Sequence, residues 1–175
     1  MPTVEAMVHR EEAVLITGVF GAGKSSAAEE IADLLERQGA PYAVLDLDWL
    51  GWFGPEDAAT HQRVLAQNLA AVVENYRAVG VRLYVLAYAV PDAAQLEHLT
   101  AVIRMPVKVV RLTVPLAEIA IRLRSDVTTG RLNDLNEAAA WLATSRGAGI
   151  EGLTIANDRP IREVAAEILD WIGWT

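Results

Sequence analysis

The sequence contains no cysteine among its 175 residues. This absence excludes a disulfide framework, a thiol nucleophile and a zinc site built from cysteine thiolates. Lysine is almost as scarce, since Lys24 and Lys108 are the only two lysines among 15 basic residues. The 23 acidic residues give the chain a net charge of −8, which would repel the phosphate backbone of a nucleic acid. The composition therefore predicts that the chain has no nucleic-acid partner.

Long apolar runs are missing as well. The longest one, residues 83–91, has the length of a strand and falls far short of the roughly 20 residues that span a bilayer. The first dozen residues are mixed and charged, and they lack the basic start and apolar centre of a signal peptide. We therefore expect no membrane association and a cytoplasmic location.

Apolar residues are nevertheless abundant, because 53% of the chain is hydrophobic and a packed core is easy to build. The length fits a single domain over residues 1–175. Near-continuous apolar runs alternate with amphipathic stretches, a pattern typical of parallel strands that helices cover on both faces. The sequence thus predicts an α/β fold with three layers, α/β/α, around a parallel sheet of about five strands. The expected strands are residues 13–17, 42–46, 81–90, 107–114 and 153–156, and the expected helices are residues 25–38, 55–79, 92–103, 115–124, 133–143 and 160–172.

A glycine-rich segment follows the first expected strand and opens the first expected helix. It reads Gly18-Val19-Phe20-Gly21-Ala22-Gly23-Lys24-Ser25 and matches the pattern G-x-x-x-x-G-K-[ST] in full. Glycines let backbone N–H groups converge on a phosphate, and the helix N-terminus adds partial positive charge. The lysine supplies a movable charge for the β- and γ-phosphates, and the serine offers a hydroxyl to Mg²⁺. We expect this segment to bind a nucleotide through Gly18, Gly21, Ala22, Gly23, Lys24, Ser25 and Ser26.

Two aspartates close the second expected strand. As alternate residues of a strand, Asp46 and Asp48 would point to the same side, at the sheet edge beside the glycine-rich segment. One carboxylate would hold Mg²⁺ or its waters, and the other would accept the proton of an attacking hydroxyl. The alternative is that one or both carboxylates only solvate the end of the strand.

The glycine-rich segment and the aspartate pair together resemble the small-molecule kinases of the P-loop NTPase superfamily. Adenylylsulfate kinases, shikimate kinases and chloramphenicol phosphotransferase-like kinases carry similar residues. The resemblance implies a kinase-type fold with a small lid at about residues 122–135, with ATP and Mg²⁺ as cofactors. It also implies that Ser25 and Asp46 serve Mg²⁺, whereas Asp48 serves the acceptor hydroxyl.

Two departures argue against the acceptors of the first two kinase groups. The asparagine and arginine that follow the acidic pair in adenylylsulfate kinases align here with Trp49 and Gly51. The glycine pair of shikimate kinases aligns with residues 88–91, which contain no glycine. The resemblance therefore implies the chemistry of phosphoryl transfer and leaves the acceptor open.

The arginines of the expected lid are Arg122, Arg124 and Arg131. In the kinases that the chain resembles, lid arginines close over the nucleotide and stabilise charge on the transferred phosphoryl group. Arg122 and Arg124 point to different faces of one helix, so we expect at most one to face the triphosphate, joined by Arg131. The alternative is a solvated arginine face, in which Glu118 pairs with Arg122 one helical turn away.

The remaining candidates flank these groups. Trp49 and Trp52 would either stack on a ring of the acceptor or pack as core beneath the loop. His61 and Arg63, near the start of a helix, would face either the acceptor or solvent. Asn157 would either line the adenine or cap the last helix.

The sequence as a whole predicts a Mg-ATP-dependent phosphotransferase that moves the γ-phosphate of ATP to a hydroxyl group of a small molecule. The alternative is a nucleotide-dependent switch or slow regulatory ATPase without an acceptor. The third expected strand ends without an acidic residue. The chain has no N-K-x-D motif of switch GTPases, and the D-x-x-G at residues 48–51 follows the second expected strand instead of the third. These observations disfavour that alternative.

Overall fold

The computed structural model describes residues 10–54, 57–124 and 131–175. In these residues five strands alternate with helices along the chain. The elements are β1 (Glu12–Thr17), α2 (Lys24–Gln38), β2 (Tyr42–Asp46), α3 (Leu47–Leu50), α4 (Ala58–Ala78), β3 (Leu83–Ala87), α5 (Ala93–Ile103), β4 (Val107–Thr113), α6 (Leu116–Arg124), α7 (Arg131–Ala143), β5 (Leu153–Ala156) and α8 (Ile161–Ile172).

Strand β1 lies at the centre of the sheet. The strand order is β2-β3-β1-β4-β5, and every neighbouring pair is parallel. The register aligns Ile16 with Ala87 and Thr17 with Arg111, so β1, β3 and β4 end nearly level. Because β3 and β4 lie on opposite sides of β1, the connections diverge there, and a ligand-binding crevice is expected at the carboxyl end of β1.

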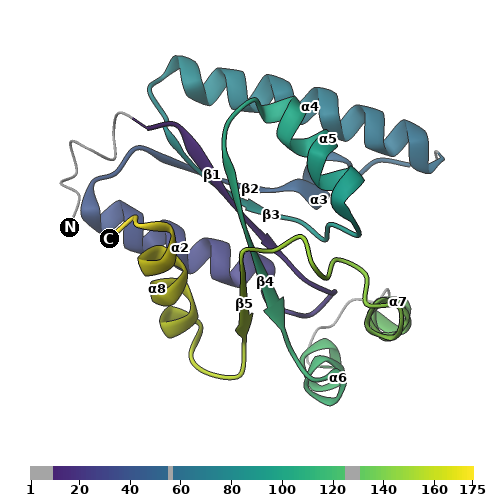
Figure 1. Cartoon of the computed structure of the whole chain (residues 1–175). Coiled ribbons are helices and arrows are strands. Elements are labelled where there is room, and N and C mark those ends of the chain that lie inside the picture. Colours follow the sequence, from purple (N-terminus) through teal and green to yellow (C-terminus); the bar gives the residue numbers. More distant parts are fainter. Residues whose placement is uncertain (1–9, 55–56, 125–130) are drawn as a thin grey trace.

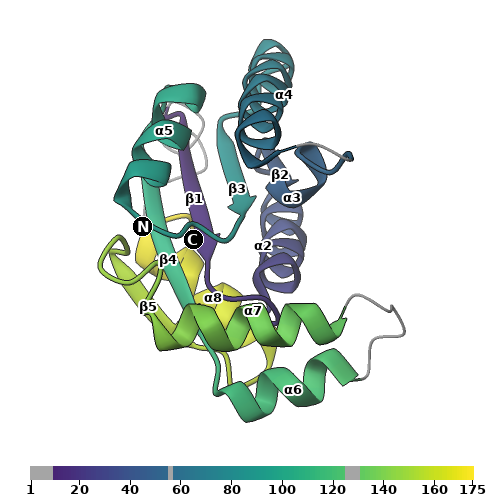
Figure 2. The ribbon, with the colours of Figure 1, turned by 90° about the vertical axis from the view of Figure 1, so that its right-hand side faces the viewer.

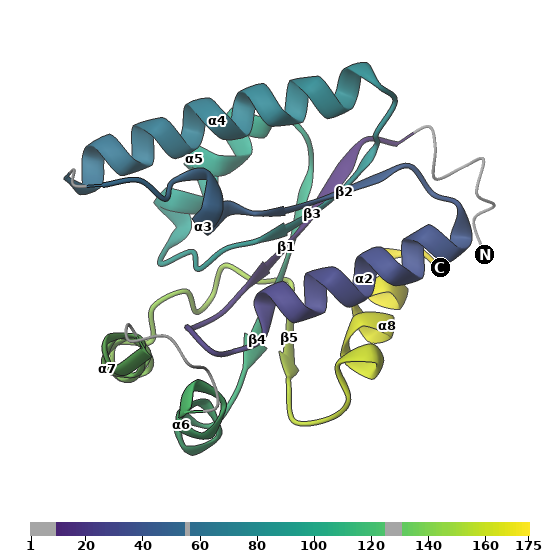
Figure 3. The ribbon, with the colours of Figure 1, turned by 180° about the vertical axis from the view of Figure 1, so that it is seen from behind.

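Helices cover both faces of the sheet. Figures 1 and 3 show α2 and α8 on one face and α4 and α5 on the other. Two separate clusters of buried side chains correspond to these two faces, one including Ile31 and Ile168 and the other including Leu69 and Leu99. The expected three-layer α/β/α fold with a five-stranded parallel sheet is therefore confirmed.

Helices α6 and α7 lie beyond the carboxyl ends of the strands, where they run side by side (Figure 2). The pair is anchored in the core by Ile119 and Ala138, which are fully buried. This is the position of the expected lid, although its residues 125–130 lie outside the described part of the chain. Among the described residues, no helix is long and apolar enough to cross a membrane.

Two elements differ from the sequence prediction. The third strand is shorter than expected and covers only Leu83–Ala87, although the N–H of Tyr88 still donates a hydrogen bond to the carbonyl oxygen of Ile16. The second strand ends at Asp46 as expected, but the next residues form the short helix α3, which was not predicted. The side chain of Asp46 accepts a hydrogen bond from the N–H of Asp48, which is the contact that starts a helix at this point.

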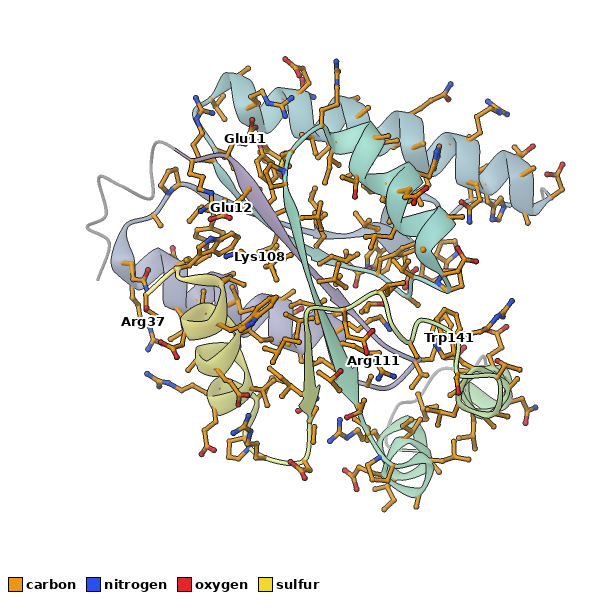
Figure 4. All side chains as sticks on the ribbon, in the orientation of Figure 1. Glu11, Glu12, Arg37, Lys108, Arg111 and Trp141 are labelled. Atoms are coloured by element: carbon orange, nitrogen blue, oxygen red, sulfur yellow. The ribbon has the colours of Figure 1, made fainter. Side chains whose placement is uncertain are left out.

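The end of the chain is fixed to the opposite edge of the sheet. The indole of Trp174 is only 1% exposed, and its Nε1 donates a hydrogen bond of 2.8 Å to Oε1 of Glu12, the first residue of β1. Nearby, Nζ of Lys108 donates to the carbonyl oxygen of Ile172 at 2.6 Å (Figure 4 labels Glu12 and Lys108). Helix α8 is thereby bound to both β1 and β4.

We expect Trp174→Ala to lower the free energy of unfolding by about 3–5 kcal/mol, because it removes a large buried side chain and leaves a cavity. It also leaves the buried Glu12 carboxylate without its indole partner. Urea unfolding followed by circular dichroism measures the change. The matched control is Trp52→Ala, whose indole is 73% exposed and which we expect to cost under about 1 kcal/mol. Equal losses for the two variants would contradict this anchoring role.

Candidate active site

The glycine-rich segment wraps around the start of α2. Gly23 is the residue before the helix and adopts a left-handed backbone with φ of 91°, and no side chain caps the helix. The first N–H groups of α2 therefore have no side-chain acceptor and are available to an anion. Gly21, Gly23, Ser25 and Ser26 all line one large cavity at this point.

Asn157 braces the segment from the other side of the loop. Its side chain is 4% exposed, and its Nδ2 donates a hydrogen bond of 2.8 Å to the carbonyl oxygen of Ala22. A Cβ atom on Gly23 would lie 2.4 Å from the same Nδ2, so only glycine fits there. Helix α8 begins at Pro160 without a side-chain cap, and the expectation that Asn157 caps this helix is therefore wrong.

Lys24 is folded back onto its own loop. Its Nζ donates a hydrogen bond of 3.1 Å to the carbonyl oxygen of Val19 and lies 5.3 Å from the centre of the Phe20 ring. Burial lowers the pKa of the ammonium, and the charges of Asp48 and Asp46 oppose that shift. The lysine thus carries its charge on the cavity wall, within the electrostatic reach of both aspartates.

Ser25 and Asp46 connect the glycine-rich segment to the end of β2. Oγ of Ser25 donates a hydrogen bond of 2.6 Å to Oδ2 of Asp46, and Oδ1 of Asp46 accepts from the N–H of Asp48 at 3.1 Å. The two side chains present adjacent oxygens, the ligand type that Mg²⁺ prefers. No cluster of three or more His, Cys, Asp or Glu residues able to hold a metal exists in the described ranges. A metal held mainly by nucleotide phosphates and waters, as Mg²⁺ usually is, fits this donor set.

Asp48 reaches the cavity from a helix and not from a strand. The predicted alternation therefore does not apply, because the chain has already turned into α3, but both aspartates still line the cavity. Leu47 is fully buried and fixes α3 to the core. Desolvation at the cavity wall raises the pKa of the Asp48 carboxyl, Lys24 opposes the shift and Asp46 adds to it. Asp48 is thus a more basic carboxylate than an isolated one.

These groups share a cavity of about 1590 Å³ at the carboxyl edge of the sheet. We call the part formed by α2, α6, the start of α7 and the β5–α8 connection the loop half; its described lining includes Lys24, Ser25, Arg122, Asp134, Asn157 and Arg159. We call the part formed by α3, the start of α4 and the end of β3 the aromatic half. Its described lining consists of Leu47, Asp48, Trp49, Gly51, Trp52, Ala58, His61, Gln62, Leu65 and Tyr88. Asp46 lies between the two halves.

The tryptophans of the aromatic half are not core residues. Trp49 and Trp52 are 69% and 73% exposed, and their ring centres lie 4.9 Å apart with an angle of 34° between the planes. The alternative in which they pack as core beneath the loop is therefore excluded. His61 lines the cavity with its ring 4.7 Å from that of Phe53, whereas Arg63 is exposed to solvent outside the cavity lining.

The lid arginines are only partly described. Arg122 lines the loop half, where its Nη2 donates to the carbonyl oxygen of Asn157 at 2.7 Å and its Nε to Glu118 at 3.1 Å. Arg122 therefore forms the ion pair with Glu118 that was considered as the alternative, and its side chain also lines the cavity. The side chains of Arg124 and Arg131 lie outside the described part of the structure.

The other two predicted loop residues lie behind the cavity. Ala22 is fully buried, and its carbonyl oxygen faces Asn157. Gly18 lines a smaller cavity of about 230 Å³, together with Arg111 and Trp141, which lie close together in Figure 4. Arg111 is neutralised there by an ion pair of 2.8 Å with Glu151.

Arg159 and Tyr88 are among the lining residues that were not singled out from the sequence. Arg159 lines the loop half and pairs with Glu167 on α8. Tyr88 lines the aromatic half, and burial raises the pKa of its hydroxyl, with a further contribution from Asp48. The available signal was position alone, since Tyr88 directly follows β3 and Arg159 lies in the connection after β5, where ligand-contacting groups gather.

Comparison with known proteins places this fold among solved kinases. No family model matches the chain, and neither does any curated protein sequence. A sugar kinase from Janibacter sp. HTCC2649 superimposes with a TM-score of 0.69, at 17% identity over 94% of this chain and 95% of that one. The Mycobacterium tuberculosis APS kinase CysC in complex with AMPPNP and APS gives 0.61, at 24% identity over 94% and 98% of the two chains.

A shikimate kinase from Acinetobacter baumannii in complex with shikimate gives a TM-score of 0.60, at 16% identity over 98% and 97% of the two chains. All three neighbours are kinases of small molecules by name, and each is covered almost completely. The chain therefore has the P-loop kinase fold, and the expected fold type is confirmed.

We expect Gly23→Ala to weaken ATP binding by at least roughly tenfold, because the new methyl group meets Asn157 and moves the loop off the helix N-terminus. Isothermal titration with ATP measures the change. The matched control is Gly39→Ala, at another left-handed glycine with φ of 70° but open space around it. The control should lose about 1 kcal/mol of stability and keep its ATP affinity. Equal loss of affinity in both variants would mean that contact with Asn157 is not what restricts position 23.

Proposed function

We propose that the protein is a Mg-ATP-dependent kinase that transfers the γ-phosphate of ATP to a hydroxyl group of a small molecule. The observation that supports this most directly is the convergence of Lys24, Ser25, Asp46 and Asp48 on one cavity, organised by the 2.6 Å hydrogen bond between Ser25 and Asp46. Phosphoryl transfer needs mainly positioned charge around the phosphates and a positioned acceptor, and this cavity offers residues for both.

The loop half would hold the nucleotide. The free N–H groups at the start of α2 would bind phosphate oxygens, and Lys24 would move from the Val19 carbonyl to the β- and γ-phosphates. Ser25 and Asp46 would hold Mg²⁺, which when bound supplies charge that offsets the negative charge of the phosphates. Arg122 would border the nucleotide on the lid side, and Arg124 and Arg131 remain candidates for stabilising the transferred group.

Asp48 would act on the acceptor. Its carboxylate lines the aromatic half within electrostatic reach of Lys24, and its raised pKa makes it a better proton acceptor than an ordinary aspartate. It would orient the acceptor hydroxyl and take its proton as the oxygen attacks the γ-phosphorus, while ADP leaves on the opposite side. We also propose a cytoplasmic location, where ATP and small metabolites are both at hand.

We expect Lys24→Ala to lower turnover by about three orders of magnitude or more, because the variant loses the mobile charge on the transferred phosphate. ADP release in the presence of Mg-ATP and a mixed pool of hydroxyl compounds measures turnover. Lys108→Ala removes the other lysine, far from the cavity, and should keep normal turnover. A fully active and folded Lys24→Ala variant would refute the kinase proposal. ATP hydrolysis that does not respond to any acceptor would instead favour a nucleotide-dependent switch.

We expect Asp48→Asn to lose at least roughly a hundredfold in turnover while its affinity for Mg-ATP changes by less than about threefold, because an amide cannot accept the proton. Titration calorimetry with a non-hydrolysable ATP analogue separates binding from turnover. The control is Asp92→Asn at the cap of α5, where asparagine caps as well as aspartate. Loss of nucleotide binding in Asp48→Asn would mean that Asp48, and not Asp46, serves the metal.

A further inference from the structure

The aromatic half of the cavity has a composition that restricts the acceptor. We propose that the acceptor is a hydroxyl compound with a flat ring and without negative charge, and that the ring stacks on the Trp49–Trp52 pair. This inference rests on the proposed kinase function and adds the chemical class of the second substrate. Two independent observations support it: the exposure of the two indoles and the distribution of charge around the cavity.

The two indoles present apolar surface inside a binding cavity. Large aromatic side chains bury most of their surface in folded proteins, yet Trp49 and Trp52 are each more than two thirds exposed. Their rings are tilted by 34° and so do not cover each other face to face. Phe53 and His61 form a second ring pair on the same side of the site, with centres 4.7 Å apart. A flat ring that enters the cavity would therefore find aromatic partners.

Positive charge is confined to the loop half. Among the described residues that line the cavity, the basic ones are Lys24, Arg122 and Arg159, and all three belong to the loop half, which also contains the carboxylate of Asp134. None of the described residues that line the aromatic half is an arginine or lysine, and its one charged side chain is the carboxylate of Asp48. An acceptor with a carboxylate, sulfate or phosphate group would meet that like charge without a basic partner.

The polar groups of the aromatic half are also few. Besides Asp48, they are the side chains of His61, Gln62 and Tyr88 and the indole N–H donors of Trp49 and Trp52, and the other lining residues are aliphatic or glycine. A polyhydroxylated sugar would need many more hydrogen-bond partners than these when it leaves water. A ring with one reacting hydroxyl and one or two further polar groups matches the lining better, as is typical of small-molecule sites.

The first test compares three matched alcohols as acceptors with Mg-ATP. The probes are para-(hydroxymethyl)benzamide, its ring-saturated cyclohexane analogue and para-(hydroxymethyl)benzoate, with glucose as a fourth acceptor class. Mass spectrometry detects the phosphorylated products. We expect kcat/KM for the benzamide to exceed that for the saturated amide and that for the benzoate by roughly tenfold each, the size of a stacking or charge contribution.

The outcomes separate the two proposals. Preference for the benzoate or for glucose would overturn the acceptor class and leave the kinase function standing. Equal use of the benzamide and its saturated analogue would overturn the stacking role of the indoles. Phosphorylation of none of the four acceptors, while Mg-ATP binds normally, would overturn the acceptor class, whereas the kinase function itself would be refuted by ADP release that no compound of the mixed hydroxyl pool stimulates.

The second test changes the cavity and keeps the probes. We expect Trp49→Ala and Trp52→Ala each to raise the KM for the benzamide about tenfold with unchanged affinity for Mg-ADP, and Trp49→Phe to recover most of the loss. Trp171→Ala removes a partly exposed indole on α8, outside the cavity lining, and should leave both values unchanged. Gln62→Arg should reverse the preference toward the benzoate. Variants that shift nucleotide affinity as much as the KM for the acceptor would contradict the proposal.

Discussion

The hydrogen bond between Ser25 and Asp46 is the interaction on which the arrangement of the site depends. It joins the first turn of α2 to the last residue of β2, two segments 21 residues apart in sequence. The second oxygen of the same carboxylate starts helix α3 and so directs Asp48 and the two tryptophans into the cavity. One side chain thereby sets both the oxygen pair suited to Mg²⁺ and the position of the residues proposed to meet the acceptor. The sheet order brings these segments together, since β2 and β1 flank β3 and all their carboxyl ends meet at one edge.

Charge divides the cavity into two chemically distinct regions. The loop half combines a lysine, two arginines and an uncapped helix N-terminus, although the chain as a whole carries a net charge of −8. The aromatic half has a single carboxylate among rings and aliphatic groups. A polyanionic nucleotide would bind in the loop half and an uncharged alcohol with a ring in the aromatic half, because the charge and the apolar surface of the two regions favour different ligands.

The fold and the position of the glycine-rich segment between β1 and α2 could be predicted from the sequence, because both depend on local patterns. Apolar runs separated by amphipathic stretches specify parallel strands and covering helices, and residues 18–25 match a complete motif in its expected context. The prediction from sequence failed where a single side chain redirects the backbone or connects segments that are distant in sequence. The capping carboxylate of Asp46 converts an expected strand end into α3, and Asn157 contacts Ala22 across 135 residues of sequence. The exposure of Trp49 and Trp52 was undecided from sequence, because tryptophan is common both in cores and in binding sites.

Asn157 connects the glycine-rich segment to helix α6. Its amide holds Ala22, and its own backbone oxygen receives the guanidinium of Arg122 from α6. Asn157 thus contacts both the glycine-rich segment and α6. Its own N–H donates a hydrogen bond to the carbonyl oxygen of Thr113, which fixes its position beside β4. A displacement of α6 would be transmitted to the loop through two short hydrogen bonds, so the two would shift as a unit. Substitutions at Asn157 would therefore change the conformation of the glycine-rich segment and the position of α6 together, and neither could be changed there without the other.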